Sequence, residues 1–88
     1  MNIEYEKKLG KNIRFLREKA GFTQEYLSTQ MQINGCDITR SALAKIEVGQ
    51  RHIYPDELKL LKELLNVTYD EIFVWQKNYF HSTLNTIK

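Results

Sequence analysis

The sequence has 88 residues, of which 42% are hydrophobic and 27% are charged, and its formal net charge is +2. This length permits one domain, and the composition is that of a globular protein rather than of a disordered or membrane-spanning chain. The polar first eight residues exclude a secretory signal peptide, so we expect a cytoplasmic protein with no membrane partner. A charge of +2 is weak evidence for a nucleic-acid partner, because only a clustered basic surface would indicate one.

The sequence lacks the residue constellations that enzymes and metal sites require. Its single cysteine, Cys36, cannot form an internal disulfide, and the two histidines, His52 and His81, stand too far from it for metal-ligand spacing. Neither a Ser/His/Asp set nor a glycine-rich phosphate loop is present. We therefore predict no metal, no cofactor and no enzymatic activity.

Two helices are predicted in the first third of the chain. A stripe at helical spacing predicts the first, over about residues 5–20, and Gly21 suits a left-handed helix stop; the stripe is Leu9, Ile13, Leu16 and Ala20. Thr23 is a candidate N-cap for a second helix over Gln24–Met31, with Phe22 placed to staple its first turn. The expected inward face of this helix consists of Tyr26, Leu27, Gln30 and Met31. Residues 32–38, which contain Asn-Gly, are expected to form a loop.

A third helix is predicted to end near Glu47, with Asp37 or Thr39 as its cap and Gly49 at its stop. Its apolar set is sparse, and its other face is polar and basic. The apolar residues are Leu43 and Ile46, with Ala42 beside them, and the outward residues are Arg40, Ser41, Ala44 and Lys45. Most of this helix is thus free to contact something else, and the DNA major groove admits an α-helix.

Two more helices complete the predicted domain. Pro55 suits the first position of a fourth helix that ends at Asn66, and its core face is Leu58, Leu61, Leu64 and Leu65. Thr68 and Glu71 form a capping box that opens a fifth helix, whose apolar residues are Ile72, Phe73 and Trp75. We therefore predict an all-α, compact five-helix domain over residues 1–75. The spacing of apolar residues in the extension, residues 76–88, permits more helix.

An ordered set of motifs resembles one family. The stretch 13–24, IRFLREKAGFTQ, then Leu27, then SALAKIEVG over residues 41–49, resembles the Cro and phage-repressor type (XRE family) of helix-turn-helix proteins. The segment of residues 58–73, which contains LNVTYDEIF over residues 65–73, is similar to that family's fourth and fifth helices. The resemblance implies a lambda-repressor-like domain that binds double-stranded DNA and regulates transcription, with repression as the expected outcome. The third helix, about residues 39–47, would read the major groove.

The resemblance also implies roles for individual residues. Arg17 and Glu47 match a structural ion pair that joins the first helix to the end of the recognition helix. Three positions match residues that face base edges, namely Arg40, Ser41 and Lys45. Others match or lie near positions that contact the DNA backbone, namely Thr23, Gln24, Thr39, Arg51 and His52. The link between the second and third helices is longer than the family's usual short turn.

Two functions from different classes remain open at this level. The first is a homodimeric repressor that binds an inverted-repeat operator, with a two-fold interface after about Glu71 that uses Trp75, Tyr79 and Phe80. The second is a protein-interaction module, such as an antitoxin that binds a partner protein and binds DNA for autoregulation. The C-terminal aromatic residues would serve either function, and they could equally cover the domain's own core.

Overall fold

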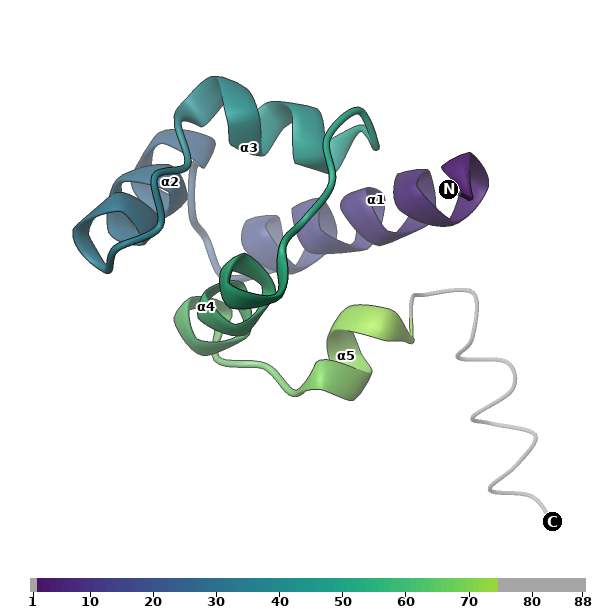
Figure 1. The fold of residues 1–88 in the computed structure, drawn as a ribbon. Helices are drawn as coiled ribbons and strands as arrows, with labels where there is room; N and C mark the ends of the chain where they lie inside the picture. The colour runs from purple at the N-terminus through teal and green to yellow at the C-terminus, as the bar shows by residue number, and fades with distance from the viewer. Residues whose placement is uncertain (1, 75–88) are drawn as a thin grey trace, which may run out of the picture.

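The computed structural model describes residues 2–74, and this part of the chain is all-helical, without a β-strand. Its helices are α1 (Ile3–Lys19), α2 (Gln24–Ile33), α3 (Arg40–Glu47), α4 (Pro55–Leu65) and α5 (Tyr69–Phe73) (Figure 1). The prediction of an all-α fold with five helices is confirmed. The extension over residues 76–88, together with Trp75, lies outside the described residues.

The helices are arranged so that α3 is supported from beneath and open on its other side. Helix α3 packs against α1 and α2, while α4 packs against α2 and α5 packs against α1. In Figure 1, α3 lies along one side of the molecule, and α4 and α5 lie on the opposite side. The third helix is therefore the element whose outer surface is presented to the surroundings.

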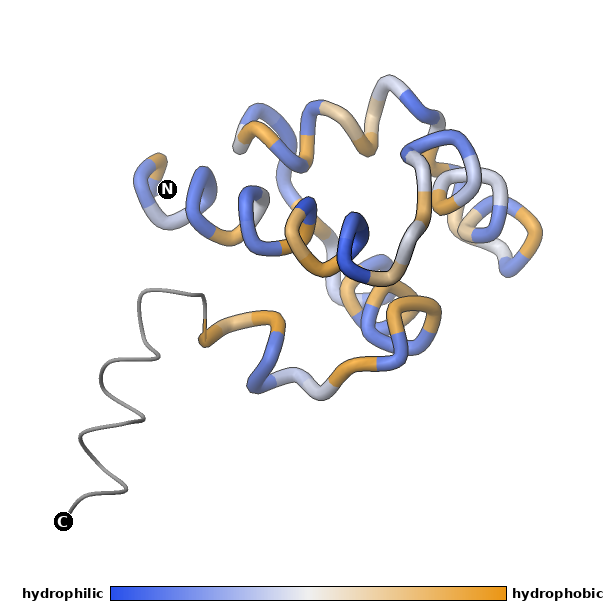
Figure 2. The backbone as a smooth tube through the Cα atoms, turned by 180° about the vertical axis from the view of Figure 1, so that it is seen from behind, coloured by the Kyte–Doolittle hydropathy of each residue, from blue (hydrophilic) through white to orange (hydrophobic). Residues whose placement is uncertain are grey.

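One apolar core joins all five helices. Along the backbone tube of Figure 2, hydrophobic and hydrophilic residues alternate with the turns of α1, as expected of a helix with one buried face. Burying a Leu or Ile side chain contributes about 1.5–3 kcal/mol, so this core is the main source of stability. Its buried members are Leu9, Ile13, Leu16, Leu27, Met31, Ile38, Leu43, Ile46, Leu61, Leu65 and Ile72.

Short polar side chains start four of the helices. The side chains of Thr23, Thr39 and Thr68 each accept a hydrogen bond from the amide three residues further on, as the sequence predicted for Thr23 and Thr68. Of the two caps considered for the third helix, Thr39 is correct. Asn2 caps α1 in the same way, so this helix starts at Ile3, before the expected start near residue 5.

The connection between α2 and α3 differs most from the expectation. Helix α2 continues to Ile33, two residues beyond its predicted end, and Asn34 rather than Gln32 is its C-cap. The predicted inward face of α2 is wrong at Tyr26, whose side chain is exposed and packs against the Phe22 ring at 4.8 Å between centroids. In the loop that follows, Ile38 is fully buried, which was not predicted from the sequence.

Candidate nucleic-acid interface

The start of α3 is fixed by the preceding loop. The buried Ile38 side chain inserts into the core, and Gln32 Nε2 donates a 2.7 Å hydrogen bond to the Ile38 carbonyl oxygen. The next residue, Thr39, caps the helix through its hydroxyl oxygen, which accepts from the Ala42 amide at 3.0 Å. A loop held in this way at both side chain and backbone sets where the first turn of α3 lies.

The buried side of α3 is narrow. Leu43, Ile46 and Glu47 are buried, whereas Ser41, Lys45 and Val48 are exposed. The exposed residues are spaced by four and three positions, which places them on one line along the helix surface. This line carries a hydroxyl, an ammonium and an apolar group, the types of side chain that contact base edges and thymine methyl groups.

A buried ion pair fixes the far end of α3 to α1. Arg17 Nε lies 2.6 Å from Glu47 Oε2, and Arg17 Nη2 lies 3.1 Å from Glu47 Oε1. The remaining terminal nitrogen of Arg17 donates to the Phe22 carbonyl oxygen at 2.7 Å. The hydrogen bond to Glu47 raises the pKa of Arg17 despite the opposing effect of burial. Arg17 and Glu47 form the ion pair that the resemblance implied.

The backbones of α1 and α3 also come into direct contact beside this pair. A Cβ atom at Gly10 would lie 2.1 Å from the Ile46 carbonyl oxygen. At Gly49, just after α3, the backbone φ is +79°, and a Cβ would lie 2.8 Å from Lys7 Cα. Only glycine permits both the approach at residue 10 and the left-handed turn at residue 49, so the sequence fixes how closely α3 rests on α1.

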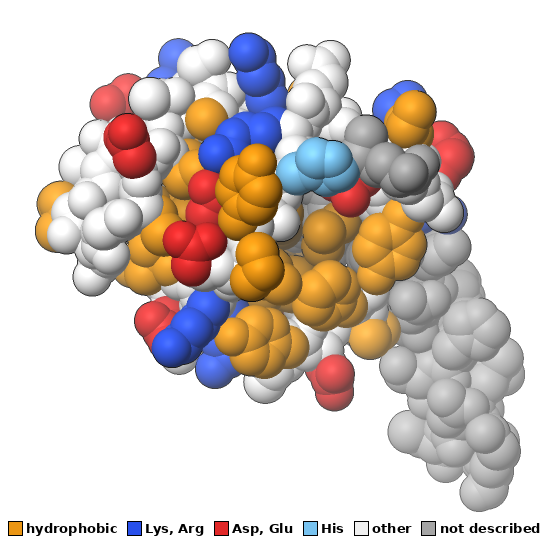
Figure 3. Space-filling model, in the orientation of Figure 1, with side chains coloured by type: hydrophobic (Ala, Val, Ile, Leu, Met, Phe, Trp, Pro, Cys, Tyr) orange, Lys and Arg blue, Asp and Glu red, His pale blue; other side chains and the backbone are white. Residues whose placement is uncertain are grey.

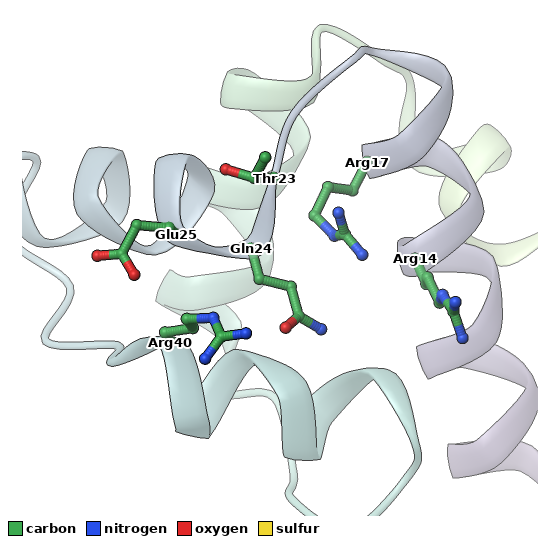
Figure 4. Close-up of a pocket in the computed structure, with 6 residues that line it drawn as sticks. All are labelled: Arg14, Arg17, Thr23, Gln24, Glu25 and Arg40. Atoms are coloured by element: carbon green, nitrogen blue, oxygen red, sulfur yellow. The ribbon is translucent and has the colours of Figure 1, made fainter.

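The N-terminus of α2 borders an open hollow between α1 and α3. The hollow has a volume of about 510 Å³ and is lined by Arg14, Arg17, Thr23, Gln24, Glu25 and Arg40 (Figure 4). Gln24 Nε2 donates to Glu47 Oε1 at 2.9 Å. Because an amide nitrogen carries two hydrogens, Gln24 retains a second donor. Gln24 therefore belongs both to the ion-pair network and to the surface that the resemblance assigns to the DNA backbone.

Arg40, one of the three residues predicted to face base edges, lies on a different side of α3 from the other two. It lines the hollow together with Gln24, whereas Ser41 and Lys45 do not. Arg40 precedes Glu47 by seven positions, which at 3.6 residues a turn is only about 20° short of two full turns. The two residues thus share the flank of α3 that faces the α2 N-terminus.

The loop after α3 contains the two remaining predicted contacts, Arg51 and His52. The Arg51 guanidinium donates to both carboxylate oxygens of Glu57, at 2.9 and 3.1 Å, and to the His52 carbonyl oxygen at 2.8 Å. Burial would raise the pKa of Glu57, but the hydrogen bonds from Arg51 and from the Tyr54 amide outweigh it and lower this pKa. His52 is exposed, with Nδ1 3.7 Å from Glu6 Oε1. The structure thus gives Arg51 a bidentate partner inside the protein.

Two buried polar residues of the described chain, Asn12 and Glu57, were not predicted from the sequence. Asn12, buried in α1, donates to the carbonyl oxygens of Glu71 and Ile72 at the end of α5, at 2.9 and 2.6 Å. Neither contact of Glu57, with the Arg51 guanidinium or with the Tyr54 amide, was predicted from the sequence. A Glu three residues after a helix N-cap was a usable signal, whereas nothing in the sequence indicated the contact of Asn12 across 59 positions.

Within residues 2–74, no cluster of His, Cys, Asp and Glu side chains could hold a metal ion. In the same part of the chain, none of the helices has the length and apolar character needed to cross a bilayer.

The geometry defines a class of protein. A short helix with a polar and basic outer face, held by a capped loop at one end and a buried ion pair at the other, is the arrangement of a helix-turn-helix that places its second helix in the DNA major groove. The helix-turn-helix family model matches residues 13–72, and the chain belongs to this family, of the Cro and phage-repressor type. It is a DNA-binding helix-turn-helix regulator. Comparison with curated proteins and with solved structures gave no match.

Proposed function

We propose that this protein is a sequence-specific repressor of transcription that inserts α3 into the DNA major groove. The observation that carries the proposal is the asymmetry of α3. One side is clamped by the core and by the Arg17–Glu47 pair, while the exposed line of Ser41, Lys45 and Val48 has no partner within residues 2–74. A clamped helix presents its free side chains in a fixed geometry, which base readout requires.

Base readout is assigned to the exposed line on α3. The Lys45 ammonium can donate to guanine O6 or N7, and the Ser41 hydroxyl can both donate and accept. Val48, which is 51% exposed, suits contact with a thymine methyl group at the end of the line. Each good base contact discriminates by about 1–3 kcal/mol, so loss of Lys45 should relax the preference at a single position of the operator.

Contacts to the DNA backbone are assigned to groups whose donors are still available. Gln24 keeps a second amide hydrogen, and the capping hydroxyls of Thr23 and Thr39 accept from the backbone but can still donate their own hydrogens. His52 is exposed and extends from the loop after α3. Arg51 supports this loop through Glu57, so its role is to position His52 rather than to contact a phosphate itself.

The proposed repressor acts as a homodimer on an inverted repeat. Two recognition helices about 34 Å apart would enter successive major grooves. Helix α5 and its C-cap offer apolar surface for a second copy: Tyr69 and Val74 are 43% and 45% exposed. In Figure 3, apolar side chains gather over the region of α4 and α5. Sedimentation at tens of micromolar, with and without DNA, tests the dimer, and a monomer in both cases would refute it.

Selection from a random pool of duplex DNA, followed by sequencing, tests the function. The parent should select an inverted repeat, and the Ser41→Ala/Lys45→Ala variant should lose or relax it. Lys59→Ala, which removes the same charge from the exposed face of α4, is the matched control and should select the parental motif. If the parent selects no motif even at low salt, where phosphate contacts are strongest, DNA readout is not the function.

One observation favours the alternative of a protein-interaction module with autoregulatory DNA binding. Tyr54 at the start of α4 is 59% exposed and carries the Arg51 guanidinium 5.7 Å from its ring centroid, a combination found in protein interfaces. This alternative predicts that deleting residues 76–88 abolishes binding of the partner protein, while Lys45→Ala leaves it unchanged.

A further inference from the structure

Arg40 lies on a different flank of α3 from the base-reading line of Ser41, Lys45 and Val48. Ser41 and Lys45 lie about 100° and 140° around the helix from Arg40, whereas Glu47 lies within about 20° of it. Glu47 is buried against Arg17 and Gln24, so this flank faces the junction of α1 and α2 rather than away from the protein. The Arg40 side chain therefore lies beside the N-terminus of α2, where it lines the hollow, and not on the outward line of α3.

The surroundings of Arg40 are those of a phosphate contact. In Figure 4, the Arg40 guanidinium and the Gln24 amide point into the same hollow, with Arg14 across from them on α1. Arg17 also lines the hollow, but its charge is compensated by Glu47. Arg14 is bound to Glu18 at 3.2 Å in an exposed pair that solvent weakens. Arg40 has no ion pair within residues 2–74, so it is the cation that is free to bind an anion there.

Among residues 2–74, Glu25 is the one carboxylate that lines the hollow. It lies more than an ion-pair distance from Arg40, and in Figure 4 its carboxylate turns away from Gln24 and Arg14. Its charge opposes an incoming anion, which makes it a sensitive probe: neutralising Glu25 should strengthen any phosphate contact at this place and should leave a base contact elsewhere on α3 unaffected.

We infer that Arg40 binds a DNA backbone phosphate together with Gln24 and contributes affinity without sequence preference. The recognition helix then has two functional sides, a base-reading line of Ser41, Lys45 and Val48 and a phosphate-binding flank of Arg40. This assignment rests on the proposed function, and it replaces the expectation from the family resemblance that Arg40 faces base edges. It also gives a role to Arg40, the first residue of α3, that is separate from the roles of Ser41 and Lys45 on the outer line.

The test measures binding of the full chain to its selected operator and to a scrambled duplex by fluorescence anisotropy, over a series of salt concentrations. Arg40→Ala should weaken both complexes by a similar factor, roughly 10-fold. It should also make the slope of log K against log salt shallower by about 0.9 for each phosphate lost per protomer. Arg40→Lys should restore most of the affinity, since a point charge suffices for a phosphate, and Glu25→Gln should tighten both complexes. Lys45→Ala should weaken the operator complex selectively.

The outcomes separate this inference from the proposed function. If Arg40→Ala weakens only the operator complex, or changes the selected motif at a base position, Arg40 reads bases and the inference is overturned. If Arg40→Ala leaves both affinities and the salt slope unchanged, the inference is overturned as well. If the parent binds neither duplex in a salt-dependent way, the proposed function itself fails. Thermal melts of each variant establish that it is folded, which is expected because Arg40 is exposed.

Discussion

Two arginine–glutamate pairs lie at the C-terminal end of the recognition helix and in the loop that follows it, and they differ in burial and in the separation of their partners along the chain. Arg17 and Glu47 are 30 positions apart in the sequence, and their side chains are only 8% and 1% exposed. Arg51 and Glu57 are six positions apart, with side chains 28% and 10% exposed. The first pair connects two helices through the interior, whereas the second closes a loop and the first turn of α4.

The difference teaches how each pair contributes. Removing one partner of a buried pair leaves a charge without water or a counterion, so the loss is large even though the pair itself adds little net stability. In the second pair, loss of Glu57 leaves an Arg51 side chain that is 28% exposed and still in contact with water, so the loss is smaller. We therefore expect the first pair to control folding of the domain and the second to control the order of a loop.

The largest expected effect is that of Glu47→Gln. It should lower the free energy of unfolding by about 3–5 kcal/mol, because Arg17 stays buried without its counterion. Urea unfolding followed by circular dichroism measures it. Glu18→Gln removes a carboxylate that is 54% exposed and should change stability by no more than about 0.5 kcal/mol. A loss below about 1 kcal/mol for Glu47→Gln would show that this pair is not buried in solution.

Gly10→Ala should have the next largest effect, because it acts on the same contact between α1 and α3 as the Arg17–Glu47 pair. The added Cβ would lie 2.1 Å from the Ile46 carbonyl oxygen, so α1 and α3 must separate. The expected cost is about 1–3 kcal/mol, despite the better helix propensity of alanine. Operator affinity should fall in parallel, because α3 shifts. Lys11→Ala, at the exposed neighbouring position, is the control; equal stability of both variants would contradict the close approach.

Glu57→Gln should cost less, about 1–2 kcal/mol, because it weakens charge-assisted hydrogen bonds that are partly exposed to water. The loss of order should be confined to the loop of residues 50–54. Amide hydrogen exchange should therefore rise there while the core amides keep their protection. Faster exchange throughout α1 and α3 would instead mean that this pair supports the whole domain as Arg17–Glu47 does.

The smallest expected effect is a pH dependence of that difference. The pKa of Glu57 is lowered from its ordinary value of 4.5 in the folded protein. Its contribution to stability is therefore complete above about pH 4.5 and is lost as the pH falls through the lowered folded-state pKa. The stability gap between the parent and Glu57→Gln should be constant near neutral pH and should close in acid. A gap that widens in acid would contradict the sign of the shift.

Local sequence signals determined most of the fold. Apolar spacing, capping threonines and the punctuation by Gly21, Gly49 and Pro55 act within a few residues, so helices α1, α3, α4 and α5 follow from the chain itself. The motif order also sufficed for the family and for the Arg17–Glu47 pair. The same signals failed in residues 32–38, where a polar Asn-Gly turn concealed the buried Ile38.

The tertiary structure decided which side chains remain free to contact DNA. Sequence placed Arg40, Arg51 and Lys45 together as cations near the recognition helix, yet their surroundings differ. Lys45 is exposed on the outer line of α3, Arg40 faces the hollow beside Gln24, and Arg51 is bound by Glu57. The formal charge of a side chain follows from its identity, but its availability depends on the partners that packing brings near it, and those partners come from distant or unrecognised positions in the chain.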